Sequence, residues 1–153
     1  MHESIRKNNG DGRMILVIRI SGKINISFKI QETLNRILLR RKYSAVLLQN
    51  TKQNIDILKN LRNYVAYGPI NDATLKLLIE KRAVLKNKDS KLDVEKIINQ
   101  IEKKSKSSWD IKPFFRLHPP LKGIDAKKHF GVTKKAVLAD NGEKINDLVR
   151  RML

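Results

Sequence analysis

The side chains that could do chemistry in this sequence are overwhelmingly cationic. Lysine and arginine together number 33, against 15 aspartates and glutamates, which gives a formal net charge of +18 at pH 7. Self-repulsion on this scale destabilises a compact chain unless an anionic partner neutralises it. Solubility alone does not require so much charge. Nucleic acid is therefore the leading candidate partner. An anionic membrane is the second, although no apolar run is long enough to span a bilayer.

Groups that could catalyse a reaction are few. The chain has no cysteine and only three histidines, which excludes disulfides and thiolate chemistry and argues against a histidine-rich metal site. Gly22-Lys23 lacks the second glycine and the Lys-Ser/Thr ending of a phosphate-binding loop. His118 beside Arg116 could be a catalytic pair, but a histidine in a basic, proline-rich loop is more often a phosphate or backbone contact. We therefore expect no enzyme, metal, cofactor or small-molecule substrate.

The positive charge is concentrated in two segments. Residues 14–68 carry ten basic and two acidic residues, and residues 112–153 carry ten basic and four acidic residues. The spacer at 69–111 is more balanced, with ten basic and seven acidic residues. Because each neutralised phosphate adds to the gain from counterion release, two cationic segments favour an extended contact with one polyanion.

These cationic segments must be positioned by a folded core, and its centre is predicted at 14–20. This run, Met-Ile-Leu-Val-Ile-Arg-Ile, is apolar and β-branched and ends at the turn signal Ser21-Gly22, as is typical of a buried strand. We expect it to be the middle strand of a small sheet. A helix is predicted after the N-cap Ser27, with one face formed by Ile30, Leu34, Ile37, Leu38 and Arg41.

The basic trio at 40–42 would then lie at the C-terminal end of that helix, where cations interact favourably with the helix dipole. That placement would explain the trio without any partner, and we keep it as an alternative to nucleic-acid binding.

The other elements follow from apolar spacing and capping residues. They are a strand at 45–49, a helix from Thr51 to about residue 64, a strand at 65–67, helices at 72–82 and 93–105, and a short strand at 84–86. Residues 14–67 thus have the order β-α-β-α-β. Two βα crossovers by themselves would favour a parallel sheet.

The composition changes at residue 109. Residues 109–123 hold the single tryptophan, two of the four phenylalanines and three of the four prolines. Pro119-Pro120 excludes a helix and favours an extended path. A loop-like region follows that contains Lys127, Lys128, Lys134 and Lys135. A last helix is predicted with Asp140 as its N-cap and Glu143 completing a capping box.

The aromatic pair Phe114-Phe115 lies inside this basic stretch. Aromatic rings in such a place can stack on the unpaired bases of irregular RNA. They can equally anchor the loop on the core of the protein itself. The sequence favours the second role and leaves the first open.

Three blocks of sequence carry a resemblance to a known family. They are Ile18-Arg19-Ile20-Ser21-Gly22 with Asn25, Tyr64–Gly68 followed by Ile70–Leu75, and Phe115–Gly123 with Ile145–Met152. In these blocks the chain resembles the archaeal-type large-subunit ribosomal protein L-thirty family, whose longer eukaryotic counterpart is called L-seven. The resemblance covers nearly all of 14–153. It departs at Phe28 and at Thr51-Lys52, where the family commonly carries proline.

The resemblance implies an α+β fold. We expect a three-stranded antiparallel sheet with the first strand in the centre and two helices on one face, similar to the ferredoxin-like fold. The expected organisation is a flexible basic tail at 1–13, a β-α-β-α-β core at 14–68, and a mostly helical and loop C-terminal subdomain with extended basic loops at 69–153.

The resemblance also implies a non-catalytic role as a structural constituent of the large ribosomal subunit, in the cytoplasm. The expected partners are large-subunit rRNA, with 5S rRNA nearby, and neighbouring ribosomal proteins, with no membrane. We expect the RNA contacts to come from Arg19, Lys23, Asn25, Lys29, Arg36, Arg40, Arg41, Lys42, Arg116, His118, Lys122, Lys127, Lys128, Lys134 and Lys135. The alternatives are a free RNA- or DNA-binding module or RNA chaperone acting off the ribosome, and an RNA-cleaving or RNA-modifying enzyme that uses His118.

Overall fold

The central strand of the sheet is β1 (Met14–Arg19), as predicted. The computed structural model describes residues 14–20, 22, 26–49, 51–86, 91, 93–103, 109–118, 125–129 and 136–153; the predicted tail at 1–13 lies outside them. Strands β2 (Ser44–Gln49) and β3 (Val65–Pro69) flank β1, both antiparallel to it. Val17 is paired with Val46 on one side and with Tyr67 on the other.

The C-terminal half of the chain adds strands at both edges of this core. On one edge, β4 (Phe115–Arg116) pairs antiparallel with β2. On the other, β6 (Ala136–Asp140) pairs parallel with β3, and β5 (Asp125–His129) pairs parallel with β6. The strand order among the described residues is β4-β2-β1-β3-β6-β5.

The fold is α+β as expected, but the observed sheet has more strands than the three that were expected. The described residues give four antiparallel strands, extended by two parallel ones. The expectation of a loop around Lys127 and Lys128 was also wrong, because both residues lie in strand β5. Aspartate and lysine are depleted in strands, and a two-residue strand shows no alternation, so neither β5 nor β4 has a sequence signature.

The helices of the described residues are α2 (Phe28–Arg36), α3 (Lys52–Leu61), α4 (Asp72–Arg82), α5 (Val94–Lys103) and α6 (Ile145–Met152). The first three begin at the capping residues that the sequence predicts. The side chains of Ser27, Thr51 and Asn71 each accept a hydrogen bond from the backbone N–H three residues further on, which confirms them as N-caps.

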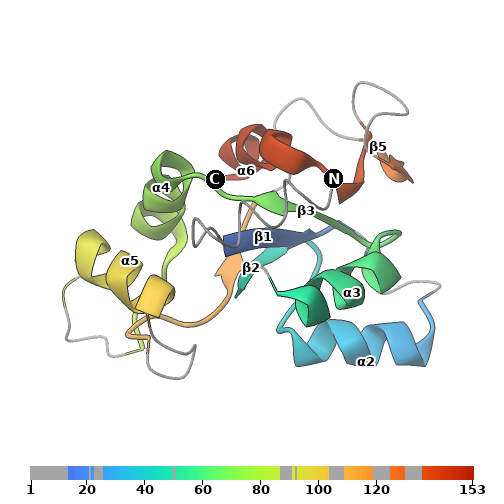
Figure 1. Ribbon diagram of the computed structural model, residues 1–153, viewed down its shortest axis with the longest axis horizontal. Coiled ribbons are helices and arrows are strands. Elements are labelled where there is room, and N and C mark those ends of the chain that lie inside the picture. The colour runs from blue at the N-terminus through green and yellow to red at the C-terminus, as the bar shows by residue number, and fades with distance from the viewer. Residues whose placement is uncertain are drawn as a thin grey trace.

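The two faces of the sheet carry separate hydrophobic cores. Successive side chains of a strand point to opposite faces, so Ile15 and Val17 lie in one core and Leu16 and Ile18 in the other. Helices α2 and α3 cover the first face, and α4, α5 and α6 cover the second (Figure 1). Because both faces are covered, β1 is apolar along nearly its whole length rather than alternating.

Two helix boundaries differ from the prediction. Helix α2 ends at Arg36 rather than continuing through Arg41, because Leu38 adopts a positive φ of 69° that a right-handed helix does not allow. Helix α6 has no side-chain cap and follows the 3₁₀ turn η2 (Gly142–Lys144). The predicted cap Asp140 is instead the last residue of β6, so the capping box with Glu143 was wrong.

A buried arginine ties β1 to the chain that follows α2. The Arg19 side chain is 0% exposed. Its Nη1 donates a hydrogen bond to the Leu39 carbonyl at 2.7 Å, and its Nη2 donates to Gln31 Oε1 at 2.8 Å and to the Gly22 carbonyl at 3.2 Å. Burial lowers the pKa of this guanidinium below its ordinary value, but arginine stays charged in proteins. The hydrogen bonds therefore hold a buried cation in place.

Helix α6 is locked to the end of β3 by an equally specific contact. Asn146 is buried, accepts a hydrogen bond from the Asn71 N–H at 2.9 Å, and donates one to the Pro69 carbonyl at 3.3 Å. Gly68 lies beneath this junction, where a Cβ would overlap the Gly142 carbonyl oxygen and touch Ile145. Only a residue without a side chain fits between β3 and the turn that leads into α6.

Replacement of the buried arginine is expected to destabilise the protein strongly. Arg19→Met keeps an apolar stem of similar length but leaves the Leu39 carbonyl and the Gln31 amide oxygen without their donor. We expect the free energy of unfolding, measured by urea denaturation, to fall by about 2–3 kcal/mol. Arg36→Met is the matched control. Arg36 is exposed and pairs with Glu32 on the helix surface at 2.8 Å, and its loss should cost no more than about 0.5 kcal/mol. Equal losses in the two variants would contradict a special role for Arg19.

The packing at Gly68 gives a second prediction. Gly68→Ala should lower the free energy of unfolding by about 1–3 kcal/mol, because the added methyl must displace backbone atoms. Gly22→Ala is the control, since a Cβ there meets no atom within 4 Å. Thermal or urea unfolding of both variants tests this, and a Gly68→Ala protein as stable as the Gly22→Ala protein would refute the packing argument.

Candidate nucleic-acid interface

The basic trio at residues 40–42 projects from the loop that joins α2 to β2. All three residues are exposed. Because α2 ends at Arg36, the trio lies beyond the last turn of the helix. The alternative that the helix dipole explains these charges is therefore wrong, since the dipole acts within the last turn.

The conformation of this loop is set from inside the protein. Leu38 and Tyr43, which bracket the loop, both have positive φ, at 69° and 65°. Non-glycine residues keep such conformations only where their surroundings impose them. Here the Leu39 carbonyl accepts from the Arg19 guanidinium, and the Tyr43 N–H donates to the Arg19 carbonyl at 2.7 Å. Arg19, predicted as an RNA contact, is thus a buried support for the arginines that reach solvent.

Strand β4 brings the second cationic segment to the same edge of the sheet. Phe115 is 0% exposed and joins the core on the side of α4 to α6, which confirms its anchoring role. Phe114 is half-buried and packs against the other core. The Arg116 side chain is exposed, with its guanidinium carbon 5.6 Å from the centroid of the Phe114 ring, within range of a cation–π contact.

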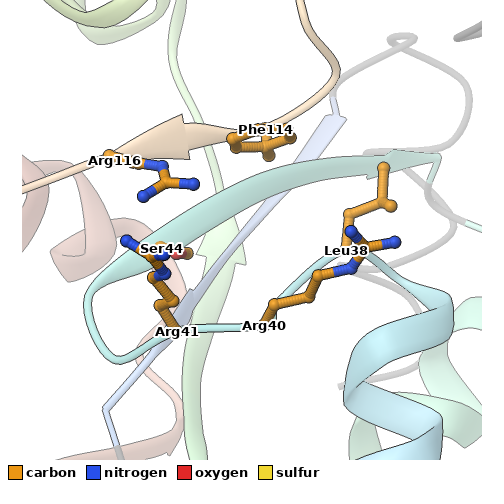
Figure 2. Close-up of a pocket in the computed structure, with 6 residues that line it drawn as sticks. All are labelled: Leu38, Arg40, Arg41, Ser44, Phe114 and Arg116. Carbon is orange, nitrogen blue, oxygen red and sulfur yellow. The ribbon is translucent and has the colours of Figure 1, made fainter.

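The two segments together enclose a pocket of about 330 Å³. Arg116 is paired with Ser44 in the β2–β4 register, so the start of β2 forms the floor of the pocket. Figure 2 shows the Arg41 and Arg116 side chains near Ser44, the Arg40 side chain extending toward Leu38, and Phe114 on the opposite rim from the loop. The lining residues are Leu38, Arg40, Arg41, Ser44, Phe114 and Arg116.

A larger and shallower pocket of about 710 Å³ lies on the other side of Phe114 and Arg116, which line both. Its remaining lining residues are Lys81, Arg82, Ala83, Val84 and Lys112. The end of α4 reaches this place because the Lys112 N–H donates to the Val84 carbonyl at 2.8 Å. The short strand predicted at 84–86 is reduced to a single antiparallel bridge between Leu85 and Ile111.

Sequence reasoning missed Lys81, Arg82 and Lys112 as members of this surface. Lys81 and Arg82 end α4, where the dipole already accounts for cations. Lys112 lies beside the aromatic pair in sequence, which is the one signal that could have included it.

We call the cations of the two pockets the basic edge. They are Arg40, Arg41, Lys81, Arg82, Lys112 and Arg116. None of the described residues that line either pocket is acidic. Within the part of the chain that the structure describes, no carboxylate forms an ion pair with any member of the basic edge. The Nε of Arg82 is buried without a hydrogen-bond partner among those residues. Nothing described in the protein neutralises this edge.

The other predicted contact residues are less closely grouped. Lys29 and Arg36 are exposed on α2 but line neither pocket. His118 is exposed, and its backbone N–H donates a hydrogen bond to the Met152 carbonyl at 2.9 Å. Only the backbone of β5, with Lys127 and Lys128, is described. The residues that lie outside the described ranges are Lys23, Asn25, Lys122, Lys134 and Lys135.

The described residues offer little for catalysis. The His118 imidazole has no hydrogen-bond or ion-pair partner among them, whereas a general base is normally oriented by a second group. No group of three histidine, aspartate or glutamate side chains in these ranges could hold a metal ion. In the same ranges, no helix has both the length and the apolar character needed to cross a membrane.

Comparison with known proteins identifies relatives along almost the whole chain. No protein-family model matches it. The chain is 35% identical to the large ribosomal subunit protein uL30 of Archaeoglobus fulgidus, over 91% of this chain and 99% of that protein. It is 33% identical to the protein of the same name from Methanococcus maripaludis, over 90% and 97%. It is 31% identical to that from Korarchaeum cryptofilum, over 92% and 95%. These matches confirm the resemblance seen in the three sequence blocks. The chain belongs to the family of the large ribosomal subunit protein uL30.

Proposed function

We propose that this chain is a structural constituent of the large ribosomal subunit, in the cytoplasm, and that it binds and stabilises folded large-subunit rRNA. Its relatives are named as large-subunit ribosomal proteins. The single observation that carries the RNA-binding mechanism is the basic edge. Its guanidinium and ammonium groups gather from three separate segments, and the described residues that line the two pockets include no acidic one.

The physical mechanism is phosphate neutralisation. Each lysine or arginine that pairs with a phosphate releases condensed counterions, and these gains add over a surface. Both halves of the chain contribute, because the core proposed at 14–68 supplies Arg40 and Arg41, and the subdomain proposed at 69–153 supplies the rest of the basic edge.

The proposed contact set follows from exposure. It includes the basic edge together with Lys29, Arg36, Lys42 and His118, whose side chains are exposed. Arg19 acts by positioning the loop at 37–43. The predicted contacts of Lys23, Asn25, Lys122, Lys127, Lys128, Lys134 and Lys135 remain part of the proposal. The proposed partners are large-subunit rRNA, with 5S rRNA nearby, and neighbouring ribosomal proteins.

A second candidate function is an RNA- or DNA-binding module or RNA chaperone acting off the ribosome. The basic edge would serve that role equally well. Sedimentation of a lysate of the source cells distinguishes the two functions. We expect the protein to migrate with the large subunit, and a protein found mainly in the light fractions would favour the module.

The mechanism predicts a steep dependence of binding on salt. The logarithm of the affinity for large-subunit rRNA should fall linearly with the logarithm of salt concentration, with a slope of about 0.7 per contacted phosphate. The double variant Arg40→Gln/Arg41→Gln should reduce that slope by about 1.4 if each arginine contacts one phosphate. Filter binding over a salt series measures both quantities.

The matched control removes the same charge from another surface. Lys52 and Lys59 are exposed on α3 and line neither pocket. Lys52→Gln/Lys59→Gln should leave the slope within about 0.3 of the wild-type value. A flat salt response of the wild-type protein would refute the electrostatic mechanism, and equal slope changes in the two double variants would refute the assignment to the basic edge.

We further propose that the protein binds RNA without cleaving or modifying it. His118→Ala should leave rRNA intact, as wild-type protein does, and should change the affinity by no more than about fivefold, because one exposed contact contributes under about 1 kcal/mol. Gel analysis of labelled rRNA incubated with each protein tests this. Cleavage by the wild-type protein that disappears in His118→Ala while binding persists would establish an enzyme instead.

A further inference from the structure

The smaller pocket contains features that phosphate binding alone does not require. Its rim combines the Phe114 ring and the Leu38 side chain with three guanidinium groups. A flat cationic surface would suffice to neutralise phosphates. A recess with an aromatic wall also offers a place for a planar ring.

We propose that this pocket binds one unpaired nucleotide of the RNA, with its base against Phe114 and Leu38 and its phosphates on Arg40, Arg41 and Arg116. The proposal rests on the proposed function and specifies the part of the RNA that is recognised. It assigns to the β2–β4 edge a preference for bulged or looped RNA over a continuous duplex.

The chemistry of RNA favours this occupant. In a duplex the bases are stacked inside the helix, and only phosphates and 2′-hydroxyls are within easy reach of side chains. An unpaired base can be turned outward and stacked on an aromatic ring or on the plane of a guanidinium. The pocket is small and part of its space of about 330 Å³ is open to solvent, so it suits the edge of one ring lying against its wall rather than a fully enclosed ligand.

The pocket is organised before any ligand binds. The Arg116 guanidinium carbon lies 5.6 Å from the centroid of the Phe114 ring, and the half-buried Phe114 packs against the core on the side of α2 and α3. The Ser44 side chain has no hydrogen-bond partner among the described residues, so its hydroxyl is available to a base edge. Arg19 holds the loop that carries Arg40 and Arg41.

The neighbouring pocket continues the path of the ligand. It shares Phe114 and Arg116 with the first pocket and adds Lys81, Arg82 and Lys112. An RNA chain that leaves the nucleotide pocket past Phe114 and Arg116 would place its next phosphates on these cations. An acidic peptide could also pair with the guanidinium groups, but its carboxylates would make no use of the aromatic wall.

The test compares two RNA hairpins with the same stem, one fully paired and one carrying a single-nucleotide bulge. Full-length protein is titrated against each fluorescently labelled hairpin at fixed salt. We expect wild-type protein to bind the bulged hairpin about tenfold more tightly, which corresponds to about 1.4 kcal/mol and lies within the range for stacking one base on an aromatic side chain.

Two variants that keep the net charge separate stacking from simple electrostatics. Phe114→Leu keeps an apolar side chain in the core but removes the ring, and Arg116→Lys keeps the charge but removes the planar group. Both should reduce the tenfold preference to less than threefold. Phe114→Leu, which changes no member of the basic edge, should do so while leaving the affinity for the paired hairpin within twofold. Phe114→Tyr should retain the preference. Phe28→Leu is the matched control, because Phe28 is an exposed aromatic residue (83%) that lines neither pocket.

Each outcome decides the proposal. It is overturned if wild-type protein shows no preference, if Phe114→Leu keeps the full preference, or if poly-glutamate displaces the bulged hairpin more effectively than unlabelled bulged RNA does. Filter binding to large-subunit rRNA in the same buffer separates this failure from failure of the proposed function. Strong rRNA binding without bulge preference overturns the pocket alone, whereas absence of both overturns the function as well. Unfolding curves for each variant confirm that it is folded.

Discussion

The loop that carries Arg40 and Arg41, two members of the basic edge, is held by one buried cation. The Arg19 guanidinium lies at the end of the central strand, where it donates to the Leu39 carbonyl, the Gln31 side chain and the Gly22 carbonyl. Burying a charge is costly unless hydrogen bonds compensate for lost water, and here the compensating groups come from both sides of α2. The acceptors gain an ordered donor in return, so the chain after α2 is held in a conformation that it would not adopt alone. The exposed residues Arg40 and Arg41 are therefore positioned by the buried residue Arg19.

The second constraint is the need to cover the edge of the sheet. An exposed edge strand presents unpaired backbone groups that other chains can pair with. The short strand β4 covers the beginning of β2, and its alternating residues serve two purposes. Phe115 fills the core and fixes the register, while Phe114 and Arg116 are left to form the wall between the two pockets. Cations that are far apart in sequence, such as Arg41 and Arg116, thereby line one pocket, and no described residue that lines it is acidic.

Much of the fold follows from local patterns. The apolar run at 14–20, the N-caps Ser27, Thr51 and Asn71, and the spacing of apolar residues predicted the central strand and the starts of three helices. The errors lie where tertiary contacts overrule local preference. The spacing of apolar residues predicted that α2 continues through Arg41. The helix ends earlier, where the Leu39 N–H donates to the Leu34 carbonyl and the Leu39 carbonyl accepts from the Arg19 guanidinium. Asp140 has the chemistry of an N-cap, yet it ends a strand because β3 offers a partner for β6.

The candidate site was predictable in its charge but not in its membership. Arg40, Arg41 and Arg116 were identified from their cationic surroundings, which are local in sequence. Arg19 was assigned to the RNA because no sequence pattern distinguishes a buried arginine from an exposed one at the end of a strand. Lys81 and Arg82 were missed because their proximity to Arg116 arises from the isolated bridge between Leu85 and Ile111. Lys112 was missed although it lies close to Arg116 in sequence. A net charge of +18 implies a polyanion. We infer that where the polyanion binds is determined by how the edge of the sheet is closed, and that edge is closed by residues from the two halves of the chain.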